Sequence, residues 1–356
     1  MAEHPMADLR KKLDSMGLFE KPTAKSWTKV VCLFVIVLSL FYAHANISSW
    51  GYTALLLPVT ALFATALAMT GHEGIHASAC KSQAGNMTLA AIVFPLFTGL
   101  SMTYWRQKHN VQHHAKPNVH NEDPDISQWP LVWSNAEYKE RKVTRFFNRH
   151  MQGYALWPVS MLVGHNMRIT GIITVLKHPF TAKKKQRFNK TWIADVVLIS
   201  LHFFVYFAVP VMLGLQFLNV LLFYIAIWSL VGSMLMAIFI VGHTGKPVIG
   251  EYDSNFMLQI ETGRSIKTNF ISRFFFVGLD KQIEHHLLPS VSHFNLHKIA
   301  PHVKEYAEKK GWDYEEIGFI KALWLSTKFV HSAWKEDLTD ISEKKLPVSA
   351  EKAVTA

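Results

Sequence analysis

Residues 193–241 read IADVVLISLHFFVYFAVPVMLGLQFLNVLLFYIAIWSLVGSMLMAIFIV, an apolar block in which only Asp195 is charged. A helix needs about 20 apolar residues to cross the hydrocarbon core of a bilayer, so the block is too long for one crossing and long enough for two. Its only turn signal is the segment 214–219, GLQFLN. A soluble fold would have to bury several fully apolar helices of this length in one core. We therefore predict two membrane-spanning helices, about 193–213 and 220–241, joined as a hairpin.

A second hairpin is predicted upstream of this block. Residues 30–47 and 51–71 contain no Asp, Glu, Lys or Arg, so each is a candidate span. The segments 87–104 and 154–176 are also apolar, but the first is interrupted by a proline and a glycine and the second contains His165, Asn166 and Arg168. We expect both to lie at the membrane interface. The predicted fold class is an all-α integral membrane protein with four transmembrane helices in two hairpins plus interfacial helices.

The charge pattern predicts how these helices are oriented. Half of the 356 residues are hydrophobic and 18% are charged, with 37 Lys and Arg against 26 Asp and Glu, a net charge of +11. The basic residues crowd into 10–29, 139–149 and 183–190, whereas the hairpin loops 45–50 and 214–219 have none. By the positive-inside rule the basic regions, and with them both termini, face the cytoplasm. We attribute the basic excess to anionic membrane lipids, not to nucleic acid.

The two ends of the chain differ from its middle. Residues 1–29 are charged and lack the apolar core of a signal peptide, so we expect a cytoplasmic N-terminal segment without a cleavable leader. Residues 335–356 are polar and of mixed charge, which is typical of a solvated tail. Residues 30–334 then form one membrane domain. Two cysteines exclude a disulfide framework.

Nineteen histidines are a high count for so apolar a chain, and eight of them follow predicted spans or the segment 87–104. Residues four apart share one face of a helix, so the pairs at 72/76 and 109/113 should each point one way, as should the set 282, 285 and 286. Imidazole binds zinc, copper, iron or nickel, and eight imidazoles exceed the four ligands that one zinc ion takes. We therefore predict two metal ions on the cytoplasmic face. The eight residues are His72, His76, His109, His113, His114, His243, His285 and His286.

The membrane topology and the predicted metal site support each other. If residues 87–104 crossed the membrane, the first two histidine clusters would lie on opposite sides and could not share a site. The charge rule independently places 139–149 in the cytoplasm. The segment 87–104 is therefore expected to enter the membrane and return on the same side.

Two other functions compete with this interpretation. Residues 72–76, HEGIH, satisfy the H-E-x-x-H pattern of zinc proteases, in which the glutamate is the general base. An intramembrane zinc protease would leave the second and third clusters without a task. A metal carrier without enzymatic activity is the other alternative. The metal content of the protein would distinguish the three functions: zinc for the protease, a labile transported ion for the carrier, and iron for the two-metal site.

The clusters resemble the three histidine boxes of the membrane-bound fatty acid desaturases, over about 49–304. The best single match is 278–289, GLDKQIEHHLLP, which is similar to the third box of the front-end branch, where glutamine replaces the first histidine. Smaller matches are Trp105-Arg106 before the second box, Asp123-Pro124-Asp125 after it, and Gln259, Thr262 and Asn269 before the third.

This resemblance implies a cytoplasmic di-iron centre that uses O2 and two electrons to remove two hydrogens from an acyl chain, leaving a cis double bond and water. The implied iron ligands are the seven box histidines, His243 and, directly or through water, Gln282, which stands where many relatives have histidine. Imidazole ligands need carboxylate or carbonyl partners on their second nitrogen. The candidates are Glu73, Asp123, Asp125, Asp280 and Glu284. The Asp-Pro-Asp run also reads as a turn and helix cap.

The resemblance also implies partners. The substrate would be a fatty acyl group on a lipid or a thioester carrier, in a tunnel whose walls we expect from 87–104 and 154–176. The His-Pro-Gly-Gly motif of a fused cytochrome b5 domain is absent, so we expect a separate electron donor of ferredoxin or cytochrome b5 type and a bacterial inner membrane location. Related hydroxylases, acetylenases and sphingolipid desaturases share the same boxes and remain alternatives.

The other eleven histidines are expected to have ordinary roles. Among them, His202 lies inside a predicted span and should hydrogen-bond a neighbouring helix, because an unpaired polar group is costly there. His120 and His165 are further candidates for contacts around the site or with lipid headgroups.

Overall fold

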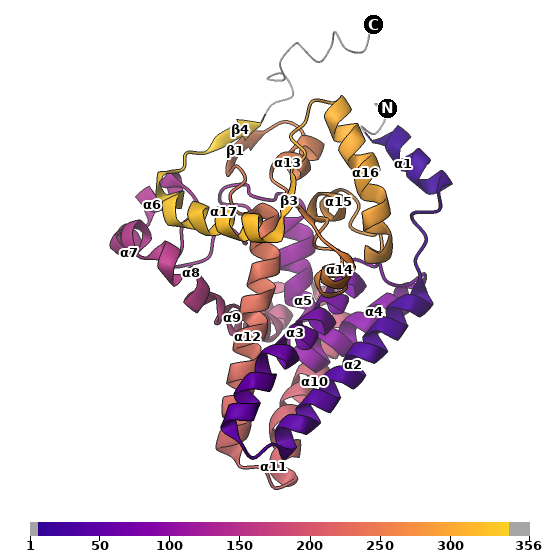
Figure 1. Ribbon diagram of the computed structural model, residues 1–356, viewed down its shortest axis with the longest axis vertical. Helices are drawn as coiled ribbons and strands as arrows, with labels where there is room; N and C mark the ends of the chain where they lie inside the picture. Colours follow the sequence, from indigo (N-terminus) through magenta and orange to yellow (C-terminus); the bar gives the residue numbers. More distant parts are fainter. Residues whose placement is uncertain (1–5, 342–356) are drawn as a thin grey trace, which may run out of the picture.

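The computed structural model describes residues 6–341, and Figure 1 shows a helical cap above a narrow stalk. The stalk consists of four helices that are long and apolar enough to cross a membrane. They are α2 (Thr23–Asn46), α3 (Trp50–Ile75), the continuous run of α10 (Lys190–Phe203), η5 (Phe204–Ala208) and α11 (Val209–Met212), and α12 (Phe217–His243). The predicted fold of four apolar helices in two hairpins is confirmed.

The stalk helices differ in what surrounds them. The apolar windows of α3 and α12 are 56% buried, whereas those of α2 and the α10–α11 run are 22% and 17% buried. The inner helices α3 and α12 pack on each other. The outer helices leave side chains such as Tyr42 and Phe204 exposed, as expected for helices that face lipid. The inner pair ends in the cap at His76 and His243, so it carries histidines into the predicted metal site.

Two pairs of helices bend sharply beside the stalk. The first joins α4 (Gln83–Ala91) and η1 (Ile92–Thr98) to α5 (Met102–Trp105) and η2 (Arg106–His113), with a bend of 112°. The second joins α8 (Gln152–Ser160) to α9 (Val163–Thr181), with a bend of 68°. These are the segments that the sequence places at the interface.

A buried acid on α10 holds the first bend. Asp195 accepts hydrogen bonds from the backbone N–H groups of Met102 and Thr103, at 2.8 and 2.9 Å, and from the hydroxyl of Ser101 at 2.8 Å. These donors start α5, where helical N–H groups have no partner within the helix. The single charge of the apolar block 193–241 therefore fixes the point at which the chain turns back.

The cap consists of short helices and two pairs of strands. Its helices are α1 (Ala7–Ser15), α6 (Asn135–Glu140), η3 (Lys142–Thr144), α7 (Arg145–His150), η4 (Lys184–Gln186), α13 (Asn255–Glu261), α14 (Phe270–Phe276), α15 (Gln282–Leu287), α16 (His293–Lys309), α17 (Phe319–Ser332) and η6 (Ala333–Lys335). β1 (Ile249–Tyr252) pairs with β4 (Thr339–Ile341), and β2 (Ser265–Lys267) pairs with β3 (Glu316–Gly318), both in parallel. These strands of three or four residues depart from the all-α prediction, because distant cap loops meet side by side and satisfy their backbone groups across the contact.

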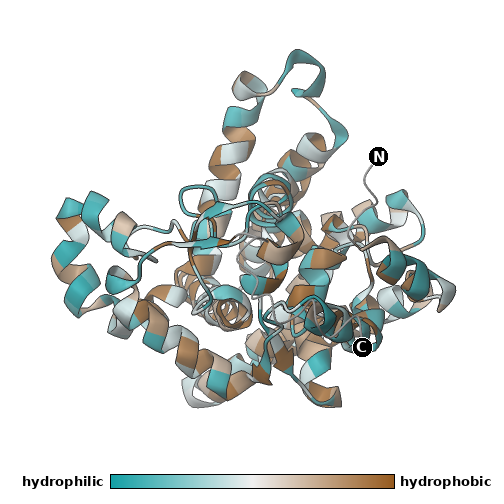
Figure 2. Ribbon diagram, turned by 90° about the horizontal axis from the view of Figure 1, so that it is seen from above, coloured by the Kyte–Doolittle hydropathy of each residue, from teal (hydrophilic) through white to brown (hydrophobic). Residues whose placement is uncertain are grey.

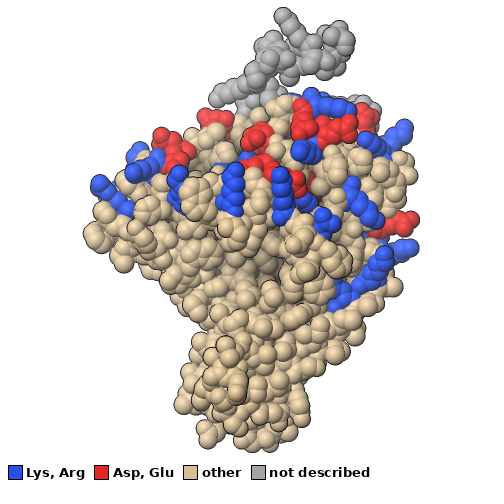
Figure 3. Space-filling view, viewed as in Figure 1, with Lys and Arg blue, Asp and Glu red and all other residues tan. Residues whose placement is uncertain are grey.

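On the face that Figure 3 draws, the charged side chains gather at the cap end of the molecule. Figure 3 shows Lys, Arg, Asp and Glu over the upper part of the molecule and a lower stalk without them. Seen from the cap, many helices mix hydrophilic and hydrophobic residues along their length, which suits a position at a membrane surface (Figure 2). The predicted domain limits at 29/30 and 334/335 stay predictions, and most of the predicted tail, from 342 onward, lies outside the described residues.

Candidate metal centre

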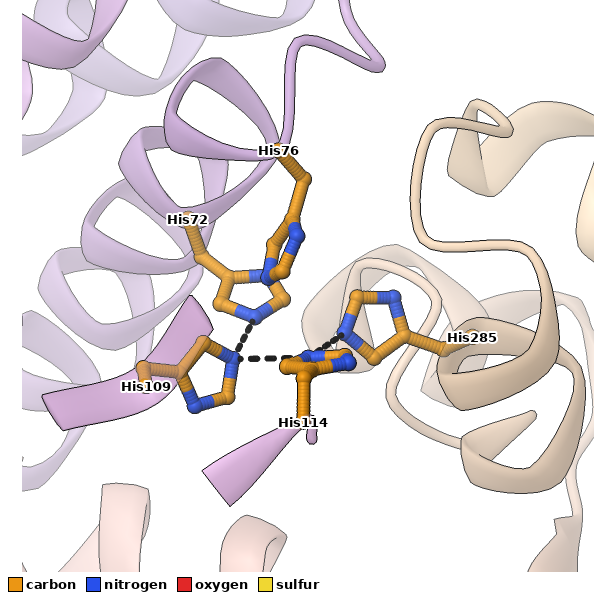
Figure 4. A group of neighbouring side chains, drawn as sticks. All are labelled: His72, His76, His109, His114 and His285. Atoms are coloured by element: carbon orange, nitrogen blue, oxygen red, sulfur yellow. Dashed lines mark hydrogen bonds between the residues drawn. The ribbon is translucent and has the colours of Figure 1, made fainter. Parts of the chain in front are cut away.

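All eight predicted histidines meet at the base of the cap, where they form two groups. The first group holds His72, His76, His109, His114 and His285, and Figure 4 shows their rings turned toward one another. The second group holds His113, His243 and His286. Within each group the ligand atoms lie within 4.8 Å of one another. Seven of the eight side chains are buried and His114 is partly buried, so the groups lie inside the protein.

Four elements supply the histidines, and two of these elements serve both groups. The histidines at the C-terminal end of α3 belong only to the first group, and the last residue of α12 belongs only to the second. On η2, His109 belongs to the first group and His113 to the second. On α15 the neighbours His285 and His286 divide in the same way. Boxes two and three therefore bridge the two groups, which helical spacing alone does not predict.

The π-helical geometry of η2 explains how the second box divides. The backbone N–H of His114 donates to the carbonyl of His109, five residues earlier. In this wider turn, residues five apart come round to the same side, so His114 joins His109 in the first group. His113, four residues from His109, stacks on its ring at 5.3 Å and faces the second group. The two rings still lie side by side, as the spacing predicts, because His109 and His113 also form a third set of neighbouring ligand atoms with Asp125.

The first group has the spacing of ligands around one ion. Nε2 of His109 lies 2.8 Å from Nε2 of His72 and 3.2 Å from Nε2 of His114, which is 3.1 Å from Nε2 of His285. Two nitrogens bound to one ion at about 2.1 Å are about 3 Å apart when the bonds meet at right angles. The fifth member, His76, has a buried Nε2 that bonds to no described residue. A cation among these five nitrogens satisfies them all.

The second group shows the fit to a metal most directly. Nδ1 of His243 donates to the carbonyl of Thr262 at 2.9 Å, and Nδ1 of His286 donates to Oε1 of Gln259 at 2.8 Å. Each neutral ring therefore has its proton on Nδ1 and a lone pair on Nε2. These two Nε2 atoms nevertheless lie 3.1 Å apart. Two lone pairs that face each other in a buried site repel, and a cation between them turns the repulsion into binding.

Carboxylates orient the third histidine of this group. Nδ1 of His113 lies 3.1 Å from both oxygens of Asp123 and 3.4 Å from Asp125. Burial favours the neutral ring, but the two carboxylates outweigh it and raise the pKa of His113. Burial also opposes ionisation of Asp125, yet Lys108 and His113 lower the pKa of Asp125 to about 2. Asp123 and Asp125 thus hold Nδ1 of His113, as predicted for partners of the ligands, and leave Nε2 for the metal.

Five histidines of the two groups are held in the neutral form, which is the form that binds metals. Burial, followed by the neighbouring imidazoles, lowers the pKa of each ring well below its ordinary value. The neutral imidazole is the metal ligand, so the site is prepared for cations at neutral pH. This holds for His76, His109, His114, His285 and His286.

Gln282 lies at the edge of the second group. Its amide nitrogen is 2.9 Å from Nε2 of His243. Gly242 makes this approach possible, because a Cβ on Gly242 would lie 2.8 Å from Cγ of Gln282. Turning the amide over would point its oxygen at the same place. Its role as a ligand stays a prediction.

Three of the five predicted acidic partners bond elsewhere. Glu73 pairs with His293, Asp280 pairs with His297, and Glu284 accepts from Ser265 and Tyr314 at 2.8 and 2.6 Å. The H-E-x-x-H glutamate therefore turns away from the histidines beside it, which removes the base that a zinc protease requires. Gln259 and the carbonyl of Thr262 orient two ligands instead. The sequence resemblance marks both positions without their roles.

A cavity reaches the metal centre from the side of η2 and α9. It has a volume of about 570 Å³ and is lined by His109, His113, His243 and Gln282 on one side and by Trp129, an exposed residue, on another. A second, apolar cavity of about 40 Å³ lies between His72 and Trp228. Trp105, Met167 and Phe239 line both cavities, so these three side chains form the partition between them. The walls include residues of both 87–104 and 154–176, where the sequence places a tunnel.

Two of the remaining histidines have ordinary partners. His202 lies 3.0 Å from the carbonyl of Leu96 through Nδ1 and 2.9 Å from the Tyr224 hydroxyl through Nε2, which confirms its predicted bonds to neighbouring helices. His165 contacts the hydroxyl of Ser229 at 3.1 Å.

Comparison with known proteins supports the same interpretation. A sequence model of the fatty acid desaturase family matches residues 47–318. Three similar proteins are an acyl-lipid (9-3)-desaturase of Physcomitrium patens, 27% identical over 294 residues, a fatty acid desaturase 2-like protein of Mus musculus, 25% identical over 324, and fatty acid desaturase 3 of Homo sapiens, 26% identical over 323. The matches cover 78%, 88% and 88% of this chain and 54%, 63% and 69% of the relatives, so the chain spans between about half and two thirds of their length.

Proposed function

The chain belongs to the fatty acid desaturase family, and from this premise we propose that it removes two hydrogens from an acyl chain with O2 and two electrons, producing a cis double bond and water. The observation that carries the proposal is the pair of histidine groups, whose Nε2 atoms converge at distances that suit two ions. Imidazole ligands suit several transition metals. We propose iron, because amino-acid side chains cannot break an unactivated C–H bond and a redox metal can.

The two groups divide the metals between them. The first ion would be held by His72, His76, His109, His114 and His285, and the second by His113, His243 and His286, with Gln282 beside it. When bound, the irons would activate O2, with two electrons from a donor, so that it can oxidise the acyl chain. The protein supplies neutral ligands that leave the positive charge of the metals intact, and it orients them through Nδ1 bonds to Asp123, Gln259 and Thr262.

The cavities suit an acyl chain. The large cavity is lined by histidines of both groups, and its lining also includes polar residues that could face a carrier headgroup. We propose that the chain lies along the ligands with its far end directed toward the partition of Trp105, Met167 and Phe239 and the apolar cavity behind it. Residues that enclose the chain also exclude water from the reacting carbon.

The carrier, the membrane side and the electron donor complete the proposal. The match to an acyl-lipid desaturase supports a lipid-bound acyl group, with a thioester as the other carrier. The charged cap and bare stalk support a centre at the cytoplasmic face of the membrane. Electrons would come from a ferredoxin or a cytochrome b5-type protein. We propose residues 30–334 as the catalytic membrane domain.

Fatty-acid analysis of cells that express the protein tests this function. We expect new double bonds with the intact protein and none with His113→Ala, while immunoblots of the membrane fraction show equal amounts of both. Hydroxylated products would instead show that the protein has the activity of the related hydroxylases. An unchanged profile from an iron-loaded, membrane-inserted protein, supplied with an electron donor and with acyl lipids and thioesters, would contradict the proposal.

A further inference from the structure

Helix α16 carries two histidines, one turn apart, that pair with two buried carboxylates. Nδ1 of His293 lies 2.6 Å from Oε2 of Glu73, and Nε2 of His297 lies 2.9 Å from Oδ2 of Asp280. Neither histidine belongs to the metal-binding groups. Their partners, however, stand beside two elements that do: Glu73 directly follows His72, and Asp280 lies two residues before α15.

The first pair joins three elements. Glu73 also accepts the backbone N–H of His293 at 2.9 Å, so its charge lies at the N-terminus of the 17-residue α16, where the helix dipole favours an anion. On the other side, Nε2 of His293 lies 3.1 Å from Nζ of Lys29, which donates to the carbonyl of Phe274 at 3.0 Å. Burial lowers the pKa of His293, although Glu73 opposes this. The neutral ring thus lies between the carboxylate of Glu73 and the ammonium group of Lys29, and it connects α3, α16 and α2.

The second pair ties the turn before α15 to the same helix. Asp280 is fully buried, its side chain accepts from the Thr268 hydroxyl and lies against Nε2 of His297, and its carbonyl accepts from the backbone N–H of Ile266 at 2.7 Å. Gly278 brings this turn against α16: its φ is +89°, and a Cβ there would lie 2.8 Å from Cβ of His293. One rigid helix therefore contacts both the first box and the start of the third.

We propose that α16 is a clamp that sets the spacing of the two metal-binding groups, with His293 and His297 as positioning residues. The proposal rests on the two-metal centre argued above. The pairs should differ in effect, because α3 gives two ligands to the first group and none to the second, whereas α15 gives ligands to both. Loosening the His293 pair should weaken one metal site, and loosening the His297 pair should weaken both.

Iron stoichiometry tests the first pair. The purified full-length protein in detergent is loaded with Fe(II) without oxygen, desalted, and measured by mass spectrometry of the metal against protein concentration. We expect about two irons in the unchanged protein and about one in His293→Ala, since mutations that disturb ligand orientation typically weaken metal binding 10–100-fold. His293→Asn, which keeps a donor at the position of Nδ1, should restore the second iron. His293→Gln, which moves the amide out to the position of Nε2, should not.

The second pair and a matched control complete the series. His297→Ala should lower the occupancy of both sites, and His297→Gln, whose amide nitrogen replaces Nε2, should recover it. His302→Ala removes another histidine from the same helix, beyond both pairs, and should retain two irons. Circular dichroism is recorded for each variant, so that loss of metal is compared only among folded proteins.

The outcomes separate this inference from the proposed function. Fewer than two irons in the unchanged, folded protein would contradict the metal centre itself. Two irons there and also two in His293→Ala would overturn the clamp and leave the function standing, as would equal iron in His293→Asn and His293→Gln. If the alanine variant does not fold, the comparison of the asparagine and glutamine variants decides.

Discussion

At the scale of single residues, the metal centre depends on where each imidazole carries its proton. Gln259 shows this well, because its amide nitrogen donates to the carbonyl of His114 at 2.9 Å and so turns Oε1 toward His286. Nδ1 of His286 must then donate its proton to Oε1 of Gln259, which leaves the lone pair of Nε2 for the metal site. Asp123 does the same for His113 with a full negative charge. Side chains that never touch a metal therefore determine which ring nitrogen is free to bind one.

Replacing Asp123 tests this role of the carboxylate. We expect Asp123→Asn to weaken iron binding at the second group roughly 10–100-fold, because the amide lacks the charge that holds Nδ1 of His113. Titration of the purified protein with Fe(II) measures the change. Glu122→Gln, which alters the neighbouring exposed acid, should leave binding unchanged. Equal affinity in both variants would refute the orienting role of Asp123.

The partition between the cavities predicts a change in substrate selection. Met167→Trp should thicken the partition that Met167 forms with Trp105 and Phe239, because a larger side chain cannot fit there without displacing its neighbours. We expect turnover of long acyl chains to fall at least about 10-fold more than turnover of short ones, a difference of about 1.4 kcal/mol. Product analysis with acyl groups of graded length measures it.

Met161→Trp is the matched control for the partition. Met161 is also on the bent α8–α9 segment but 40% exposed, so enlarging it should not affect chain length. A uniform loss of activity for all lengths in Met167→Trp would show that the partition does not select substrate.

At the scale of elements, two departures from regular α-helix build the site. The π-helix η2 contributes to both histidine groups, and the bend after η1 returns the chain to the cap side. π-Helical turns are rare and often functional. A helical wheel drawn for 3.6 residues per turn does not show that His114, five residues after His109, turns to the same side as His109.

The bend after η1 depends on Asp195. Asp195→Ala would leave the N–H groups of Met102 and Thr103 and the Ser101 hydroxyl without their acceptor, which costs about 1–3 kcal/mol for each buried group that finds no other partner. We expect a lower midpoint of thermal unfolding in detergent. Ser200→Ala, an exposed position on the same helix, should leave the midpoint unchanged. Equal midpoints would mean that another contact holds the bend.

At the scale of the whole molecule, charge and hydropathy separate the cap from the stalk (Figure 3). The positive-inside rule predicts that the cap faces the cytoplasm. The structure is compatible with this orientation because the loops at the far end of the stalk, near Ser48 and Gly214, are remote from the cap (Figure 1).

Cysteine labelling measures the orientation. In a chain without Cys32 and Cys80, we expect Ser48→Cys to react with a membrane-impermeant maleimide from the outer side of sealed cells. Lys142→Cys, in the cap, should react only after the membrane is opened. Both positions are exposed in the fold, so accessibility reports the side of the membrane. The reverse pattern would overturn the cytoplasmic assignment.

The sequence by itself determined the four spans, the confinement of charge to one end and the eight histidines, because hydropathy, charge and box spacing act over short stretches of chain. The tertiary structure alone decided how the histidines divide into groups, that Glu73 and Asp280 pair with histidines of α16, and which residues line both cavities. These features arise where α3, η2, α12 and α15 converge from distant parts of the chain. The direction of a ring nitrogen there depends on packing among all four elements, which no local pattern records.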